Sequence, residues 1–188
     1  MRNVLFALLT LFSFATLAAA QVPTSGNVFF GYSYYSTNLS STDRANTNGW
    51  EATGEGKVLP FIGIVGDFSA HYGTEHFPIA CPQGGINVTG GCPSNDFNVS
   101  EHDYLFGPRA FVSLGKIRPF AEFLIGAAHA SANGYASDTS FASAFGGGLD
   151  YKLVGLLAWR FQGDYVHTSL FGTGHNNVKI ATGIVFRF

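Results

Sequence analysis

Charged side chains are scarce in this sequence. Lysine and arginine number 10 and aspartate and glutamate 12 among 188 residues, so charged residues make up 12% of the chain, about half the share in an ordinary soluble domain. The formal net charge of −2 argues against a general nucleic-acid binder, which needs a basic surface. A membrane barrel explains the shortage, because side chains that face lipid need no charge.

Cysteine is also scarce, with Cys81 and Cys92 as the two examples. A second pair that could complete a zinc site is missing, and the sequence indicates no metal, no cofactor and no catalytic residue. In an exported chain, two cysteines this close in sequence indicate a disulfide within a loop. Closing so short a loop would stabilise the fold by roughly 3 kcal/mol.

Long apolar runs are confined to the N-terminus. Arg2 precedes the apolar stretch from Val4 to Leu17, and the small residues Ala18 to Ala20 form a cleavage-like site, as in a secretory signal peptide. We therefore expect a signal peptide over residues 1–20 and one domain over residues 21–188. An N-terminal membrane anchor is the alternative. Beyond it the chain has no run of the ~20 apolar residues that a membrane helix needs.

Apolar and polar side chains alternate with a period of two along much of the chain. In the last segment, Phe188, Phe186 and Ile184 share one face, and Arg187 and Lys179 share the other, because side chains on a strand point to opposite faces in turn. Seven further segments alternate in this way. The eight expected strands cover residues 27–36, 49–59, 62–73, 104–114, 119–131, 141–153, 156–165 and 179–188.

The connectors between these segments are alternately short and long. Membrane barrels have short periplasmic turns and longer external loops, so the sequence predicts an all-β fold, an eight-stranded antiparallel up-and-down transmembrane barrel in the bacterial outer membrane. A β-sandwich or a lipocalin also alternates, with the apolar face inside instead of outside. The low charge and the terminal aromatic strand favour the membrane barrel.

The charged residues fall into three groups on this map. Most of the acids outside the strands fall in the long loops, and the bases Lys116, Arg118 and Lys152 fall in the short turns. We expect the loop acids to be Asp43, Glu75, Asp96, Glu101, Asp103 and Asp138. The nearly neutral network that we expect inside the barrel consists of Glu51, Glu55, Lys57, Asp67, Arg109, Glu122, Asp150, Arg160, Asp164, Lys179 and Arg187. Buried charges must be paired.

Several short motifs resemble the small outer-membrane β-barrel proteins of the OmpA/OmpX/opacity type. They are Leu105-Phe106-Gly107-Pro108-Arg109, Pro119-Phe120-Ala121, Asp164-Tyr165, Asn176-Asn177 and the C-terminal run from Thr182 to Phe188. The resemblance covers the barrel domain only, and Ala181 stands where a polar residue is often found. It implies that the terminal aromatics Phe186 and Phe188 form part of the signal read by the barrel-assembly machinery.

Three functions fit such a chain. The first is a structural or surface-interaction role, in which the acidic loops contact an external ligand and the barrel wall contacts outer-membrane lipid. The second is a narrow ion channel, although eight strands enclose a space that side chains fill. The third is a lipid A-modifying enzyme, for which His167-Thr168-Ser169 supplies half of a motif without the carboxylate that should follow. We expect the first, without enzymatic activity.

Overall fold

Eight antiparallel strands make up nearly all of the described chain. The computed structural model describes residues 25–37, 45–78, 94–132, 136–170 and 174–188. The strands are β1 (Gly26–Thr37), β2 (Ala45–Leu59), β3 (Ile62–Pro78), β4 (Ser94–Phe111), β5 (Ile117–Ala132), β6 (Ala136–Val154), β7 (Leu157–Thr168) and β8 (His175–Arg187). The expected signal peptide lies outside the described residues.

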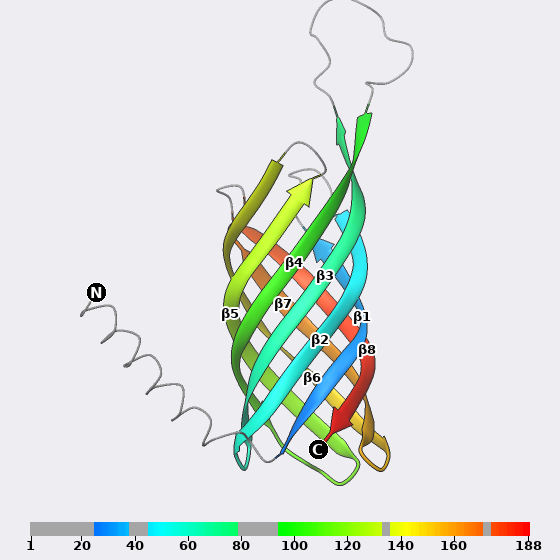
Figure 1. The fold of residues 1–188 in the computed structure, drawn as a ribbon, viewed down its shortest axis with the longest axis vertical. Helices are drawn as coiled ribbons and strands as arrows, with labels where there is room; N and C mark the ends of the chain where they lie inside the picture. Colours follow the sequence, from blue (N-terminus) through cyan, green and yellow to red (C-terminus); the bar gives the residue numbers. More distant parts are fainter. Residues whose placement is uncertain (1–24, 38–44, 79–93, 133–135, 171–173) are drawn as a thin grey trace, which may run out of the picture.

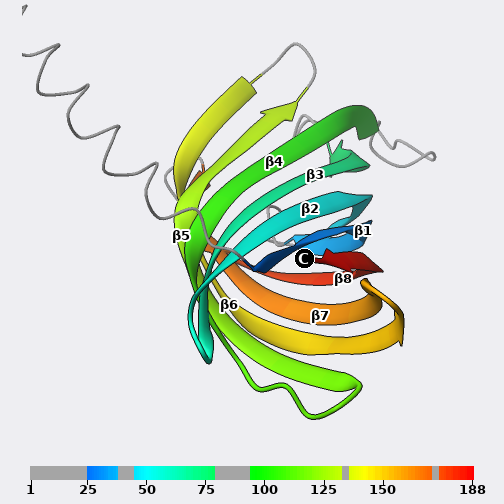
Figure 2. The same cartoon turned by 60° about the horizontal axis from the view of Figure 1, so that its bottom comes forward.

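The strands form one closed barrel in sequence order. Each strand pairs with its neighbours along the chain, and β1 pairs with β8 to complete the ring, which Figure 2 shows from below. Closure leaves the barrel wall without an edge, so each strand has a paired neighbour on both sides within the ring. The expected fold class, an eight-stranded antiparallel barrel, is confirmed.

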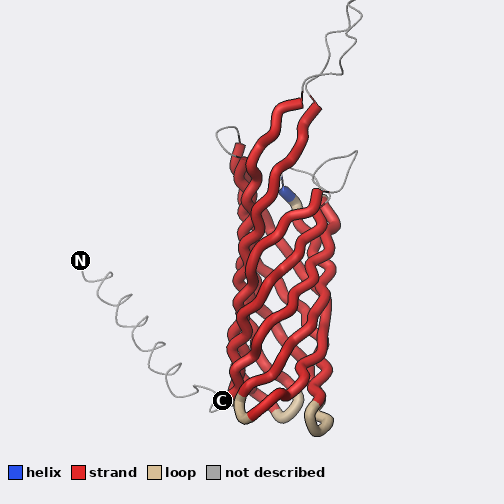
Figure 3. The backbone as a smooth tube through the Cα atoms, turned by 90° about the vertical axis from the view of Figure 1, so that its right-hand side faces the viewer, coloured by secondary structure: helices blue, strands red, loops and turns tan. Residues whose placement is uncertain are grey.

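Tight turns join the strands at the end of the barrel that holds the C-terminus, called here the turn end (Figure 3). Gly115 and Gly155 lie in two of these turns with φ of 64° and 56°, a conformation that suits glycine because it has no Cβ. Three of the four connections at the opposite, loop end are longer, as expected. The fourth is not, because β5 ends at Ala132 and β6 begins at Ala136, so most of this expected long connector belongs to these two strands.

Large apolar side chains point outward around the barrel. Strand β7 shows a strict alternation of exposed and buried positions, and its exposed set includes Trp159, Phe161 and Tyr165. The buried set of the same strand includes Arg160, Gln162 and Asp164. An apolar outside with a polar inside is the pattern of a barrel in lipid, and it is the reverse of a lipocalin.

No helix in the described part of the chain is long and apolar enough to cross a membrane.

Several strands extend further toward the loop end than the sequence predicted. Strand β3 continues to Pro78, and β4 begins at Ser94, ten residues before the expected start at Tyr104. Both strands therefore take in part of the segment expected as a loop. The reason is that beyond the membrane the outward residues are polar, so alternation of apolar and polar side chains no longer marks a strand there.

Two glycines face each other across the seam between β1 and β8. Gly31 lies opposite Gly183, and a Cβ added to Gly183 would lie 2.4 Å from the Cα of Gly31. Glycine at both positions lets the two backbones approach each other where the barrel closes.

We expect Gly183→Val to weaken closure, because the added side chain must displace backbone. The free energy of unfolding, measured by urea titration of the barrel in detergent micelles, should fall by about 1–3 kcal/mol. Gly54→Val is the matched control, since a Cβ at Gly54 meets no atom within 4 Å. Equal effects of the two substitutions would contradict this role for the seam.

Candidate functional site in the barrel interior

The inner wall of the barrel carries most of its charged side chains. Ten of the eleven residues expected in the inner network point into the barrel: Glu51, Glu55, Asp67, Arg109, Glu122, Asp150, Arg160, Asp164, Lys179 and Arg187. All are buried except Arg187, whose side chain is 26% exposed. They separate along the barrel axis into two groups with different charge.

Nearer the turn end lies a group of arginines paired with acids, called here the paired layer. Its members are Glu55, Arg109, Arg118, Glu122, Asp150, Arg160 and Arg187. Four bases thus face three acids. These seven groups can satisfy one another because Arg109, Arg118 and Arg160 each contact more than one partner.

The contacts of the paired layer are direct. Arg160 donates from Nε and Nη2 to the two carboxylate oxygens of Asp150 at 2.6 and 3.1 Å. Arg109 donates to Glu122 at 2.7 Å and to Glu55 at 3.1 Å. Arrangements in which one arginine holds both oxygens of a carboxylate are strong and specific in direction.

Aromatic rings complete the packing around these arginines. The guanidinium carbons of Arg109 and Arg160 lie 4.2 and 4.7 Å from the ring centroid of Phe120, so both cations flank one ring. Arg118 lies 3.7 Å from the ring centroid of Phe111. Cations over aromatic faces are stabilised by the ring quadrupole. The paired layer therefore fills the barrel cross-section with side chains.

Nearer the loop end lies a second group, called here the acid layer, in which acids far outnumber bases. It consists of Glu51, Asp67, Glu101, Asp103, Asp164 and Lys179, each 3% exposed or less. The ammonium of Lys179 lies 2.9 Å from Asp67, 3.2 Å from Glu51 and 3.9 Å from Asp164. One base therefore faces five carboxyl groups.

Neutral polar groups surround the acid layer. Gln162 donates through Nε2 to Glu51 at 2.6 Å and to Asp164 at 3.1 Å. Ser69 donates to Asp103 at 3.3 Å, and Tyr35 donates to Glu101 at 3.2 Å. These donors stabilise some carboxylate oxygens without adding positive charge.

The interior differs from the sequence-based expectation at four residues. Lys57 does not belong to the inner network: its side chain is exposed near the turn end, with Nζ 5.8 Å from the ring centroid of Phe111. Arg118, expected in a turn, points inward and contacts Glu55. Glu101 and Asp103, expected in a loop, are buried on β4. Inside the described barrel, eight acids and five bases replace the near balance that we expected.

One sequence signal could have located the two acids. Glu101 and Asp103 continue the odd-numbered series of Leu105 and Arg109, which faces inward on β4. The outward neighbours in this stretch are His102 and Ser100, which are too polar to mark the lipid side. Arg118 carries the same kind of signal, because it continues the even-numbered series of Phe120 and Glu122, which faces inward on β5.

The remaining predicted site residues lie at the ends of the chain or outside the described part. Phe186 and Phe188 are exposed on the outer wall beside the seam, where the backbone of Phe188 exchanges two hydrogen bonds with Gly26. Their recognition by the assembly machinery stays a prediction. Cys81 and Cys92 lie outside the described residues, so the loop disulfide also stays a prediction.

Two histidines bear on the enzyme alternative. His167 is exposed, and its Nδ1 lies 2.8 Å from the amide oxygen of Asn176. His71 lies 2.9 Å from the hydroxyl of Ser33, which is a distance suited to a base and a nucleophile. Both of these residues are 0% exposed, however, so a substrate cannot reach them. Within the described residues, the hydrogen-bond partner of His167 is an amide oxygen and that of His71 is a buried hydroxyl.

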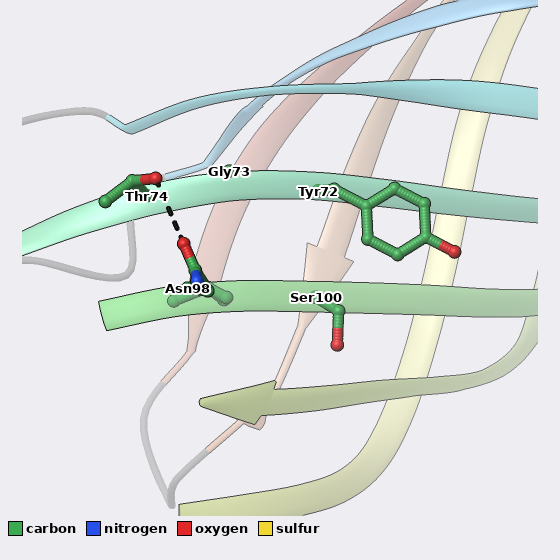
Figure 4. A pocket seen from close by; sticks show the side chains of 6 residues that line it. Tyr72, Gly73, Thr74, Asn98 and Ser100 are labelled. Carbon is green, nitrogen blue, oxygen red and sulfur yellow. Dashed lines mark hydrogen bonds between the residues drawn. The ribbon is translucent and has the colours of Figure 1, made fainter. Parts of the chain in front are cut away.

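A different feature lies on the outside of the loop end. Strands β3 and β4 rise above the other strands as a hairpin (Figure 1), and an open hollow of about 530 Å³ lies along it. Tyr72, Gly73, Thr74, Asn98, Val99 and Ser100 line the hollow. Thr74 donates to Asn98 across the strand pair at 3.3 Å (Figure 4).

The fold is shared with solved outer-membrane barrels. The chain is similar to Ail, the attachment invasion locus protein of Yersinia pestis, with a TM-score of 0.55 and 15% identity over 87% of this chain and 98% of that one. It is also similar to Neisserial surface protein A, with a TM-score of 0.62 and 12% identity over 87% and 97% of the two chains. A complex of Ail with the heparin analogue sucrose octasulfate gives a TM-score of 0.52, with 14% identity over 87% and 98%.

No protein-family model matches the sequence, and no curated protein matches it either. The closed barrel, its apolar outside and its charged inside nevertheless define a class. The chain is a small transmembrane β-barrel with the architecture of bacterial outer-membrane proteins. The expected resemblance to small outer-membrane barrels and the expected location in the outer membrane are confirmed through this fold.

We expect Arg160→Met to destabilise the barrel strongly, because it leaves Asp150 without its bidentate partner. The free energy of unfolding in detergent micelles should fall by about 3–5 kcal/mol. Lys57→Met, which removes an exposed cation, should change it by less than about 0.5 kcal/mol. A large effect of Lys57→Met would show that this lysine does belong to the inner network.

Proposed function

We propose that the protein is a non-enzymatic surface-interaction protein of the outer membrane, and that its contact element is the hairpin formed by β3 and β4. The barrel is the support, and the hairpin extends past it on the side of the long loops (Figure 1), which face outward in outer-membrane barrels. Its role is to bind an external polypeptide, with an adhesion-like result at the cell surface.

The observation that supports this proposal is a pair of strand edges that no described strand covers. Within the described residues, β2 pairs with β3 as far as Tyr72, opposite Asn48, whereas β3 continues to Pro78. On the other side, β4 pairs with the described part of β5 from Val99 onward, whereas β4 begins at Ser94. These upper edges of β3 and β4 would offer backbone groups to a partner strand.

Edge pairing suits a partner that has an extended segment. Main-chain hydrogen bonds would supply affinity, and pockets for alternate side chains would supply selectivity. The hollow along Tyr72, Thr74, Asn98 and Ser100 lies directly beside these edges, where it could accept one such side chain (Figure 4).

A sulfated polyanion fits less well. Ail has been solved with a heparin analogue, but the loop segments of this chain contain a single arginine, Arg44, and the acids Asp43, Glu75, Asp96 and Asp138. A negatively charged glycan would be repelled by such loops. We therefore propose that the external ligand is an extended polypeptide segment and not a polyanion.

We expect cells that express the protein to attach to epithelial monolayers, and we expect attachment to fall to the vector level when the upper hairpin is removed. The variant replaces residues 75–97 by an Asn-Gly turn, which keeps Thr74 and Asn98 and the barrel below them. The measurement is the count of attached cells at matched surface levels of the protein. A Lys57→Met variant serves as the control.

Equal attachment of the full-length and trimmed variants would contradict the hairpin as the contact element. Attachment that is lost on adding free sucrose octasulfate, and that survives trimming, would point to a polyanion instead.

Ion conduction is the main alternative function, and the filled cross-section opposes it. Arg109, Arg160 and Phe120 are 0–7% exposed in the paired layer, as expected of a narrow barrel whose interior is occupied by side chains. We expect the purified barrel to give no stable conductance steps in planar bilayers. Of the possible variants, Arg109→Ala should be the most able to produce such steps, because it removes a large side chain from the paired layer. Regular steps from the unaltered protein would support a channel.

A further inference from the structure

The acid layer has a charge imbalance that its ion pairs do not resolve. The layer holds five carboxyl groups, those of Glu51, Asp67, Glu101, Asp103 and Asp164. Its one lysine, Lys179, pairs with Glu51, Asp67 and Asp164. If every carboxyl group were ionised, the layer would hold a net charge of about −4 away from water. Isolated charges in such surroundings are strongly unfavourable unless they are paired or neutralised.

Unpartnered oxygens are a second and independent observation. Oδ1 of Asp67 and Oδ1 of Asp103 are buried and accept no hydrogen bond from the described residues, and the same holds for the amide oxygen of Gln162. Buried oxygens of native proteins almost always have a donor. The acid layer is therefore short of hydrogen-bond donors as well as of positive charge.

The neighbouring strands do not supply the missing charge. β1 contributes the hydroxyls of Tyr35 and Ser33, β3 contributes His71, and β7 contributes the neutral Gln162. The inner faces of β5 and β6 at this level carry Ala128, Ala142 and Ala144. On the side of the turn end, Glu122 of β5 is itself a carboxylate and is paired with Arg109.

A bound metal ion is not favoured by the arrangement of these side chains. Within the described ranges, no group of three or more histidine, cysteine, aspartate and glutamate side chains is placed to hold a metal ion. The position between the carboxylates is taken by the ammonium of Lys179. A proton, in contrast, needs no cavity and converts an acceptor oxygen into a donor.

We propose that the acid layer is a proton-binding site: at neutral pH its carboxyl groups retain protons and share them by hydrogen bonds between neighbouring carboxyl oxygens. The retained protons supply both the missing donors and the missing positive charge. They also make closure of the barrel pH-sensitive, since the layer can stay buried only while the protons remain bound.

The sign of the resulting pH dependence follows from proton counting. In the unfolded chain these carboxyl groups are in water and ionised at neutral pH, so the folded barrel binds more protons than the unfolded chain. Stability therefore falls as the pH rises, and the unfolding equilibrium constant rises about tenfold per pH unit for each retained proton.

We expect the unfolding equilibrium constant of the barrel in detergent micelles to rise between about pH 7 and about pH 9, a window above the usual histidine titration. Asp67→Asn and Asp103→Asn each replace a carboxyl group by an amide of the same shape, so each should flatten this rise. Asp150→Asn is the matched control: Asp150 belongs to the paired layer, so its loss should weaken the barrel equally at every pH.

An infrared spectrum of the unaltered barrel in D₂O at about pH 7 provides a test that does not depend on any variant folding. We expect the carbonyl band of protonated carboxylic acids, and we expect it to be smaller in Asp103→Asn. Absence of this band from the unaltered protein, a flat pH profile, or a rise that both amide variants keep would overturn the proposal. Stabilisation by added Na⁺ or Ca²⁺ at constant pH would show that a cation, not a proton, neutralises the layer.

Discussion

The pairing of β1 with β8 is the contact on which the rest of this structure depends. In lipid, an unpaired strand edge would leave a row of backbone groups without hydrogen bonds. The ten residue pairs of the seam, from Asn27 with Arg187 to Ser36 with Val178, remove that edge. Once the ring is closed, every strand has a lipid side and an inner side. The exposed aromatic side chains lie on the first side and the buried charges on the second, so the positions of both depend on the seam.

Inside the ring, two neighbouring layers solve the problem of buried charge differently. In the paired layer, arginines such as Arg109 and Arg160 bind carboxylates and stack on Phe120, so charge, hydrogen bonds and packing are satisfied together. In the acid layer, Lys179 alone neutralises part of the negative charge. Arginine, with its five donors, can satisfy several carboxylates, whereas one ammonium offers three.

The sequence predicted the barrel well because lipid imposes a strong contrast between its two faces. Along β7, exposed and buried positions alternate without exception, with Trp159, Phe161 and Tyr165 outside and Arg160, Gln162 and Asp164 inside. The prediction was wrong where this contrast disappears. Above the membrane, His102 separates Glu101 from Asp103 and all three look like loop residues. At the turn end, the alternation with Phe120 and Glu122 gives Arg118 an inward direction, but no local pattern identifies its partner Glu55, 63 positions away in the chain.

The two inner layers also give the barrel an electrical polarity along its axis. Once the carboxyl groups of the acid layer lose their protons, negative groups gather toward the loop end and arginines toward the turn end, so the field inside the barrel points from the arginines to the acids. A small cation that approached from the loop end would first be attracted and then meet the guanidinium groups of Arg109 and Arg160. An anion would be repelled before reaching them. The same arrangement that organises the interior thus opposes the passage of either sign of ion.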